Sequence, residues 1–249
     1  MDFQRIQFTP DVVPSDVTGF TMYQKETGTF VYRPGVVMCN FLLADEINRT
    51  SSKTQAALLE VMEEGRVTVD GETHEVPKPF VVLATENPVG SSGTQMLPES
   101  QLDRFMVSLS MGYPDHESLV EILRDRQDTN PLDHAETVVH KEELLKLQEQ
   151  VQKVYMDDRI LSYVADLAEA TRAHALITLG LSPRGTLALI QSAKAMAMLR
   201  GRDYLLPDDI MPLCQDVLAH RILTKGGVAA EQVLDEVLHQ VPAPMPDRR

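Results

Sequence analysis

The chain has 249 residues, of which 43% are hydrophobic, and this length allows one large hydrophobic core or two modest ones. Its formal net charge of −14 argues against a general binding surface for nucleic acids or anionic membranes, and no stretch reaches the roughly 18 apolar residues of a membrane span. The first residues, MDFQRIQFTP, contain an acid and no apolar core, so a cytoplasmic protein is expected.

Strand-like apolar runs recur in the first part of the chain, up to about residue 115. The run NFLLAD does not alternate between apolar and polar residues, which is typical of a strand buried on both faces, as in parallel sheets flanked by helices. We therefore predict an α/β half. Its predicted strands lie within RIQF (5–8), VVMCNFLLAD (36–45), FVVLAT (80–85) and FMVSLSM (105–111).

One helix is clearly marked between the second and third of these runs. Ser52 and Gln55 form a capping-box pattern, and Gly65 ends the apolar run of this helix. The next segment, RVTVDGETHEV (66–76), alternates around an Asp-Gly dipeptide, which favours a hairpin because both turn residues need positive φ. We predict that this hairpin is an insertion projecting from the edge of the sheet.

After about residue 116 the strand signals end and helical periodicity takes over. The second half is therefore predicted to be all-helical. Its predicted helices lie within HESLVEILRDRQ, KEELLKLQEQVQKVY, DRILSYVADLAEATRAHA, SPRGTLALIQSAKAMAML and PDDIMPLCQDVLAHRIL.

Polar side chains follow two of the buried strands. Asp45 and Glu46 end the run FLLADE, and Asn87 follows FVVLAT after Thr85 and Glu86. If these strands are parallel neighbours, their carboxyl ends meet at one sheet edge, where two carboxylates can hold Mg²⁺ and polarise a water while an amide orients it. The alternatives are a solvated strand-to-loop turn for the acids and an ordinary turn residue before proline for Asn87.

Two arginines could supply positive charge to a transferring phosphoryl group. Arg104 lies in LPESQLDRFM, and Arg184 lies in LSPRGT, at the start of a helix with Ser182 as N-cap. A cation in the first turn opposes the helix dipole by a few tenths to about 1 kcal/mol, a cost that a bound phosphate would offset. Each arginine could instead pair with a surface acid, which for Arg104 would be Asp103 or Glu99.

The segment FLLADEINRTSSKTQAALLEVMEEGRVTVDGETHEVPKPFVVLATENPVGSSGTQMLPESQLDRF closely resembles the MoxR family of AAA+ ATPases. The match extends through YPDHES and, more weakly, into the helices with SPRGTLAL and LLPDDI, so it covers nearly the whole chain. The resemblance implies a P-loop-type parallel sheet in an AAA+ core (1–115) and a helical lid domain (116–249). It also identifies the hairpin 66–76 as the insertion typical of this clade.

The same resemblance implies roles for five residues. Asp45 and Glu46 are the Walker B acids, with Asp45 binding Mg²⁺, and Asn87 is sensor 1. Arg104 is the arginine finger offered to a neighbouring subunit, and Arg184 is sensor 2 on the lid. ATP and Mg²⁺ are the implied cofactors. Such proteins form rings, usually hexameric, and act as chaperone-like motors that assemble or activate partner protein complexes.

One element of this family is missing from the sequence. A P-loop ATPase needs G-x-x-x-x-G-K-[ST] to bind phosphates, and the chain has no Gly-Lys pair, while Lys53-Thr54 lacks the preceding glycines. We therefore expect an incomplete sheet without its first strand and phosphate loop, in a truncated ATPase that is inactive as this chain. The alternative is a nucleotide-independent scaffold that retains motor residues as relics.

Overall fold

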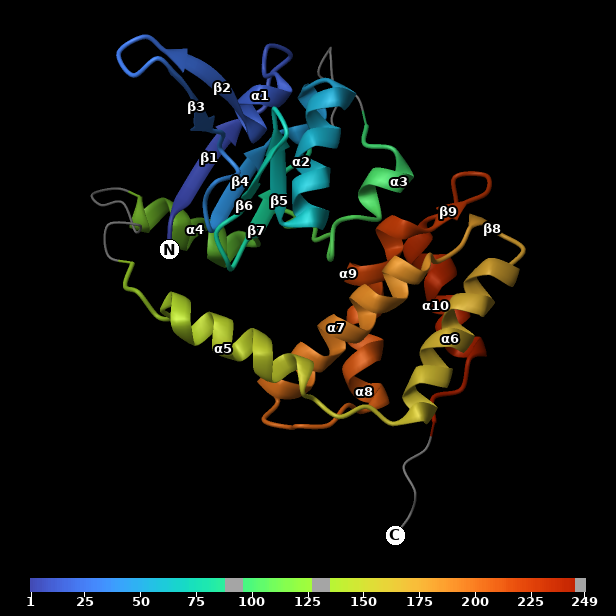
Figure 1. The fold of residues 1–249 in the computed structure, drawn as a ribbon. Coiled ribbons are helices and arrows are strands. Elements are labelled where there is room, and N and C mark those ends of the chain that lie inside the picture. The colour runs from blue at the N-terminus through green and yellow to red at the C-terminus, as the bar shows by residue number, and fades with distance from the viewer. Residues whose placement is uncertain (88–95, 127–134, 245–249) are drawn as a thin grey trace.

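The computed structural model describes residues 1–87, 96–126 and 135–244 and has an α/β part and a helical part (Figure 1). One hydrophobic core includes Phe8, Leu42 and Leu58 around the sheet, and a second includes Leu167 and Leu218 between the helices. A parallel sheet in the first part and helices in the second agree with the architecture expected from the sequence.

Three parallel strands form the central sheet, in the order β1–β4–β7. They are β1 (Phe3–Gln7), β4 (Phe41–Asp45) and β7 (Val81–Ala84). The register places Gln7 beside Asp45, while Ala44 pairs with Ala84. The carboxyl ends of all three strands therefore meet at one edge of the sheet, as predicted.

A β-hairpin lies in each of the two connections between these strands. The predicted hairpin consists of β5 (Arg66–Val69) and β6 (Glu72–Glu75), and its turn residues Asp70 and Gly71 have φ of 50° and 84°. A hairpin that the sequence analysis did not predict, β2 (Gly19–Gln24) with β3 (Thr29–Pro34), lies between β1 and β4. The rings of Tyr32 and His74 stack at 3.8 Å and join the two hairpins.

The helix after β4 begins one residue earlier than its sequence pattern suggested. A 3₁₀ turn, η1 (Ile47–Arg49), precedes α2 (Ser52–Glu64), whose N-cap is Ser51. The expected capping box is therefore wrong, because the Gln55 amide donates to the Ile47 and Thr50 carbonyls instead. The predicted helix end is confirmed, since Gly65 has φ of 65° and closes the helix.

The strand predicted within residues 105–111 is wrong: between 96 and 126 the structure contains no strand. The Ser108 N–H donates to the Asp216 carbonyl of the helical part at 2.8 Å, and Leu109 and Met111 are exposed. An apolar run forms a strand only where a neighbouring strand pairs with it, and here its backbone bonds to the helical part instead.

The second part of the chain was predicted to be all-helical, and it is helical except for one pair of short strands. Two short strands that the sequence did not predict, β8 (Ile177–Leu179) and β9 (Leu223–Thr224), pair within it. None of the described helices is long and apolar enough to cross a membrane. Within the described residues, the helices besides α2 and η1 are α1 (Pro14–Thr18), α3 (Glu99–Leu102), α4 (His116–Asp125), α5 (Lys141–Gln152), α6 (Asp158–Ala173), α7 (Pro183–Leu199), α8 (Pro207–Ile210), η3 (Met211–Leu213), α9 (Cys214–Leu218), η4 (Ala219–Arg221) and α10 (Ala230–Gln240).

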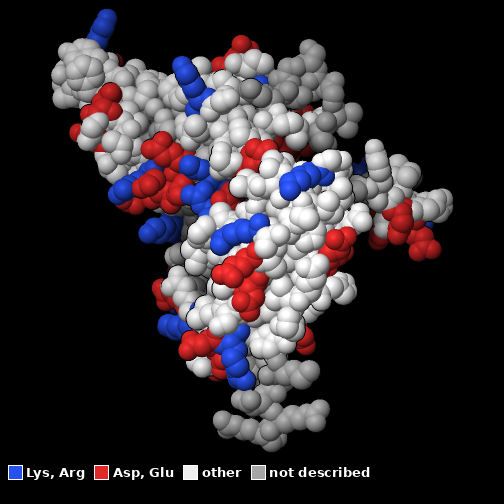
Figure 2. All heavy atoms as spheres, turned by 90° about the vertical axis from the view of Figure 1, so that its right-hand side faces the viewer, with Lys and Arg blue, Asp and Glu red and all other residues white. Residues whose placement is uncertain are grey.

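Charged side chains of both signs are interspersed on the face shown in Figure 2. Acidic and basic side chains gather together where the α/β part meets the helical part, and the described Lys and Arg residues of this face form no continuous basic area.

Candidate functional site

The strand β4 ends in the two carboxylates at the carboxyl edge of the sheet. Asp45 is the last residue of β4, and Glu46 follows it with a left-handed φ of 53°. The turn is held by Thr85 after β7, whose hydroxyl accepts from the Glu46 N–H at 2.8 Å and whose carbonyl accepts from the Ile47 N–H at 3.0 Å. The end of one strand thus fixes the backbone at the end of its neighbour.

Asp45 is ionised and partly accessible. Its Oδ2 accepts from Arg5 Nη2 at 2.7 Å, and its Oδ1 accepts from the Thr85 hydroxyl at 2.6 Å. These two hydrogen bonds, the one from Arg5 first, lower the pKa of Asp45 below its ordinary value. The side chain of Asp45 is 23% exposed and that of Arg5 is 56% exposed, so this pair can open to solvent.

Glu46 is held by two side chains that bond to the same oxygen. Gln7 Nε2 and Arg49 Nη1 both donate to Glu46 Oε2, each at 2.8 Å. Gln7 reaches Glu46 because it lies beside Asp45 in the parallel register. The arrangement fixes the direction of a carboxylate that is still 23% exposed.

Asn87 is positioned through its main chain by Asn48. The Asn48 amide donates to the Asn87 carbonyl at 3.2 Å, and the Asn87 N–H donates to Asn48 Oδ1 at 3.4 Å. Asn48 is fully buried, while Asn87 is exposed. The ends of β4 and β7 therefore bring Asp45, Glu46 and Asn87 to one edge of the sheet.

Sequence reasoning missed the side chains that hold this edge: Arg5, Gln7, Asn48, Arg49 and Thr85. Arg5 and Gln7 lie two residues apart on β1, so they point to the same face of the strand. Two polar residues on either side of the apolar Ile6, at that spacing in a predicted strand, were the available signal.

The donor set at this edge fits Mg²⁺ that is shared with a phosphate ligand. Mg²⁺ prefers oxygen ligands and is commonly bound by one or two carboxylates together with water and phosphate oxygens. The Arg5 guanidinium neutralises the Asp45 carboxylate in this structure, and a bound cation could neutralise the same carboxylate in its place. Within the described residues, no group of three or more His, Cys, Asp and Glu could hold a metal ion by itself.

The two predicted arginines meet at a different carboxylate, Glu63 in the last turn of α2. Arg104 Nη1 donates to Glu63 Oε2 at 2.6 Å, and Arg184 Nη2 donates to Glu63 Oε1. The hydrogen bonds and ion pairs found for the described residues join neither arginine to Asp45 or Glu46. The structure therefore assembles an acid edge and a separate pair of arginines.

The helix that carries Arg184 begins as predicted. The Ser182 hydroxyl accepts from the Gly185 N–H at 3.1 Å, and Pro183 occupies the first helical position of α7. The partners suggested for Arg104 were Asp103 and Glu99, but Asp103 instead binds Arg221 and Ser182. Glu63, like Arg221, was not identified from the sequence.

Comparison with known proteins gives two family matches along the chain. Residues 1–107 match the ATPase family associated with various cellular activities (AAA), and residues 169–240 match an AAA lid domain. These ranges contain β1 to α3 with the acid edge, and α7 to α10 of the helical part with Arg184.

Similar proteins and structures cover nearly the whole chain. The uncharacterized protein YeaC of Bacillus subtilis is 48% identical over 98% of this chain and 78% of its own length. The chaperone MoxR1 of Mycobacterium tuberculosis is 39% identical over 95% of this chain and 64% of its own length. The crystal structure of an ATPase candidate from Cytophaga hutchinsonii superposes with a TM-score of 0.89 at 39% identity, covering 98% of this chain and 78% of that one.

Proposed function

This chain belongs to the MoxR family of AAA+ ATPases, and on that premise we propose that its sheet edge supplies the hydrolytic residues of an ATP site. The observation that carries the proposal is the position of Asp45 and Glu46 at the end of β4, with Thr85 to Asn87 of the neighbouring strand end beside them. Ligands of open α/β sheets bind outside the carboxyl ends of the strands.

Each acid has a distinct proposed role. Asp45 would exchange Arg5 for the Mg²⁺ that accompanies ATP, because its carboxylate is ionised and its present partner is exposed. Glu46 would accept a hydrogen bond from the attacking water and polarise it, and Asn87 would orient that water. When bound, Mg²⁺ contributes Lewis-acid polarisation of the phosphate oxygens.

Arg104 and Arg184 are proposed to neutralise charge on the phosphates. Arg184 would act within its own subunit from the lid, and Arg104 would act on the site of a neighbouring subunit in a ring, with a hexamer as the expected assembly. Their shared partner Glu63 is 43% exposed, which leaves both guanidinium groups able to change partner. The work of such a ring would be chaperone-like assembly or activation of a client protein complex.

The proposal applies to a complete ATPase domain. The 249 residues contain no Gly-Lys pair and hence no phosphate-binding loop of the P-loop type. The cytoplasmic location also stays a prediction.

The test uses a fusion in which the first strand, phosphate loop and following helix of a MoxR relative precede residue 1. Glu46→Gln in this fusion should bind Mg²⁺–ATP with the affinity of the parent but hydrolyse it about 100-fold more slowly or worse, because it keeps the metal ligand and loses the base. Calorimetric titration measures binding, and phosphate release measures turnover. Glu60→Gln, at an exposed position of α2, is the matched control and should hydrolyse ATP at the parental rate.

Two results would contradict the proposal. If Glu46→Gln lost affinity for Mg²⁺–ATP to the same extent as it lost turnover, Glu46 would be a nucleotide-binding residue and not the residue that polarises the attacking water. A fusion that binds Mg²⁺–ATP and hydrolyses it no faster than its Glu46→Gln variant would favour the nucleotide-independent scaffold instead.

A further inference from the structure

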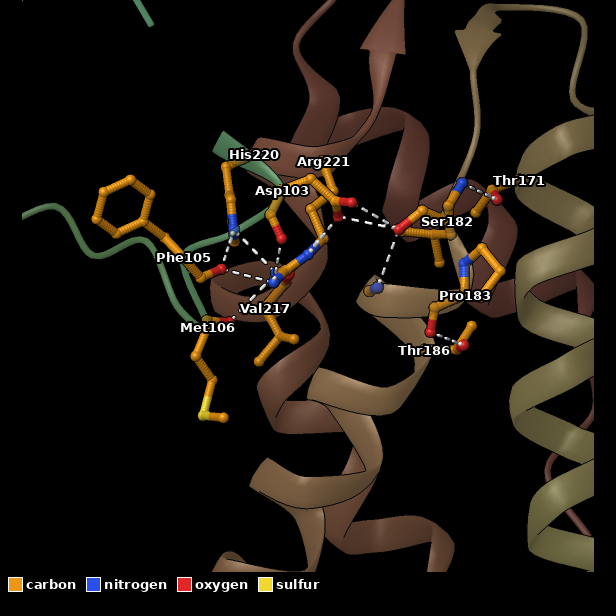
Figure 3. A network of polar contacts seen from close by, with 12 residues as sticks. Asp103, Phe105, Met106, Thr171, Ser182, Pro183, Thr186, Val217, His220 and Arg221 are labelled. Atoms are coloured by element: carbon orange, nitrogen blue, oxygen red, sulfur yellow. Dashed lines mark hydrogen bonds and ion pairs between the residues drawn. The ribbon is translucent and has the colours of Figure 1, made fainter. Parts of the chain in front are cut away.

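A buried polar network joins the helical part to the segment that carries Arg104 (Figure 3). Both carboxylate oxygens of Asp103 accept from the Ser182 hydroxyl, at 3.0 and 2.8 Å, and Oδ1 also accepts from Arg221 Nε at 3.0 Å. The side chain of Arg221 is 2% exposed and that of Asp103 is 19% exposed. We call these three residues, Asp103, Ser182 and Arg221, the interdomain lock.

The guanidinium of Arg221 also donates hydrogen bonds to main-chain carbonyls of both the segment 103–106 and the helical part. It donates to the carbonyls of Asp103 and Met106, each at 3.2 Å, and to the carbonyl of Phe105. On its own side it donates to the Val217 carbonyl of α9. A planar group with five donors suits this task, because one side chain fixes several acceptors in a defined geometry.

The neighbouring histidine adds no second positive charge to the lock. His220 Nε2 lies 3.1 Å from the Phe105 carbonyl and 2.9 Å from Arg221 Nη1. Burial, and next the charge of Arg221, lower the pKa of His220 below its ordinary value. The imidazole is therefore neutral at neutral pH, and the buried charges are those of Asp103 and Arg221.

The start of α7 closes over Arg221 because position 185 is glycine. A Cβ at Gly185 would lie 2.9 Å from Arg221 Cδ and 3.3 Å from Nε. Ser182 thus belongs to the lock and Gly185 contacts it, and Arg184 lies between these two residues in the sequence. Arg104 directly follows Asp103, which belongs to the lock, and Arg184 directly precedes Gly185, which contacts it. Both arginines that share Glu63 are therefore next in the sequence to a residue at this network.

We infer that Arg221 is a positioning residue that sets the distance between Arg104 and Arg184 by holding the lid against the segment 103–106. The arginine proposed for the neighbouring subunit's site and the arginine proposed for its own site would then keep a fixed separation. In this structure both guanidinium groups bind the carboxylate of Glu63. The inference rests on the proposed function of the two arginines, but the placement it describes follows from contacts that involve no nucleotide.

The experiment measures that placement directly, in the full 249-residue chain. A short bis-maleimide is applied to the Arg104→Cys, Arg184→Cys double variant, and the fraction of intramolecularly crosslinked chain is measured by mass spectrometry. The native thiols Cys39 and Cys214 are buried and do not compete for the reagent. Adding Arg221→Met should lower the crosslinked fraction several-fold, because the lid and the 103–106 segment lose their common donor.

Arg202→Met is the matched control. Arg202 also binds a buried carboxylate, that of Asp209, but both residues lie within the helical part. This control should lower thermal stability while the crosslinked fraction stays at the parental level. A structural role of Arg221 that did not reach the two arginines would give the same pattern as Arg202→Met.

Ser182→Ala covers the case in which Arg221→Met does not fold, since it removes the contacts of the Ser182 hydroxyl with Asp103, together with the side-chain N-cap of α7, and leaves the ion pair. It should lower the crosslinked fraction to a smaller extent. An unchanged fraction in folded Arg221→Met, or in Ser182→Ala if the former is unfolded, would overturn the inference. Failure of the proposed function would appear instead as absent ATP turnover, with the crosslinking pattern unaffected.

Discussion

The carboxylates at the sheet edge and the carboxylate of Asp209 in the helical part are both bonded to arginine, yet their surroundings are opposite. Asp45 is 23% exposed and its partner Arg5 is 56% exposed. Asp209 is fully buried and accepts from Arg200, Arg202 and the Leu206 N–H. An acid whose partner is exposed can exchange it for a metal ion or a water, whereas an enclosed acid with several fixed donors serves stability.

The local backbone differs in the same sense. Asp209 lies in the first turn of α8, where a carboxylate is favoured by the helix dipole and accepts from the N-cap N–H of Leu206 at 2.9 Å. Glu46 has a φ of 53°, a conformation that a side chain with a Cβ disfavours. The geometry at Asp209 stabilises the folded state. The backbone conformation at Glu46 destabilises it and at the same time fixes the direction of the Glu46 side chain.

The largest effect is expected for Asp209→Asn. Removing the charge leaves Arg202 without its counter-ion in a mostly buried place, which should lower the free energy of unfolding by about 3 kcal/mol. Urea denaturation followed by circular dichroism measures it. Asp208→Asn, at the exposed neighbouring position, should change stability by less than about 0.5 kcal/mol. A comparably small effect at Asp209 would remove the distinction between the two regions.

Acidification should reduce the difference in the free energy of unfolding between the wild type and Asp209→Asn. Burial by itself would raise the pKa of Asp209, but the hydrogen bonds from Arg202 and the Leu206 N–H outweigh it and lower the pKa. The folded pKa thus lies below the unfolded value near 3.9, so the contribution is full above about pH 5 and is lost as the pH falls through the folded pKa. The urea midpoints of the two proteins, measured from neutral to acidic pH, should converge. A constant difference between the midpoints over this range would contradict the lowered pKa of Asp209.

Gly185→Ala tests how closely the enclosed region is packed, and its effect should be intermediate. Alanine inside a helix normally gains up to about 1 kcal/mol over glycine. Here the new Cβ would lie 2.9 Å from Arg221 Cδ, so a loss of about 1 to 2 kcal/mol is expected. Urea unfolding of Gly185→Ala, beside Leu187→Ala at an exposed site of the same helix, measures the effect. Stabilisation by the alanine would mean that Arg221 is free to move aside.

The smallest effect, with the opposite sign, is expected for Glu46→Gly. Glycine relieves the left-handed strain but has a more flexible unfolded chain, so stability should rise by about 0.5 kcal/mol while hydrolysis by the extended protein is lost. Asp70→Gly is the matched control, because Asp70 has a φ of 50° in a turn outside the site. The two variants should show the same gain in thermal melts. A loss of more than about 1 kcal/mol at Glu46 alone would assign it a structural role.

The acid edge could be predicted from the sequence because it depends on local signals and one general rule. Continuous apolar runs indicated parallel strands, and parallel strands place Asp45, Glu46 and Asn87 at one edge whatever the rest of the fold does. The hairpin at 66–76 was equally predictable, since its Asp-Gly turn has positive φ at both residues. The hairpin at 19–34 has a longer turn without an Asp-Gly dipeptide, and its Phe20 and Phe30 are exposed. It therefore has neither the two-residue turn nor the continuous apolar run that marked the other elements.

The arginine pair and the interdomain lock could not be predicted in the same way. Glu63 is an ordinary surface acid of α2 until the lid places Arg184 against it, and Arg221 lies in a helical run that resembles any other. Their partners are distant in the sequence and meet only when two hydrophobic cores have packed. Residue spacing carries no information about such a meeting.

The hairpins inside the two crossovers lie within the loops that the parallel strand pairings close. Pairing Phe3 with Phe41 closes a long loop, and the entropy of that closure slows the formation of parallel sheets. Pairing Gly19 with Pro34 beforehand removes the middle of that loop from the flexible chain, and isolated hairpins close within about 1 to 10 microseconds. If the hairpin β2–β3 forms first, it therefore shortens the flexible loop that has to close before β1 can pair with β4.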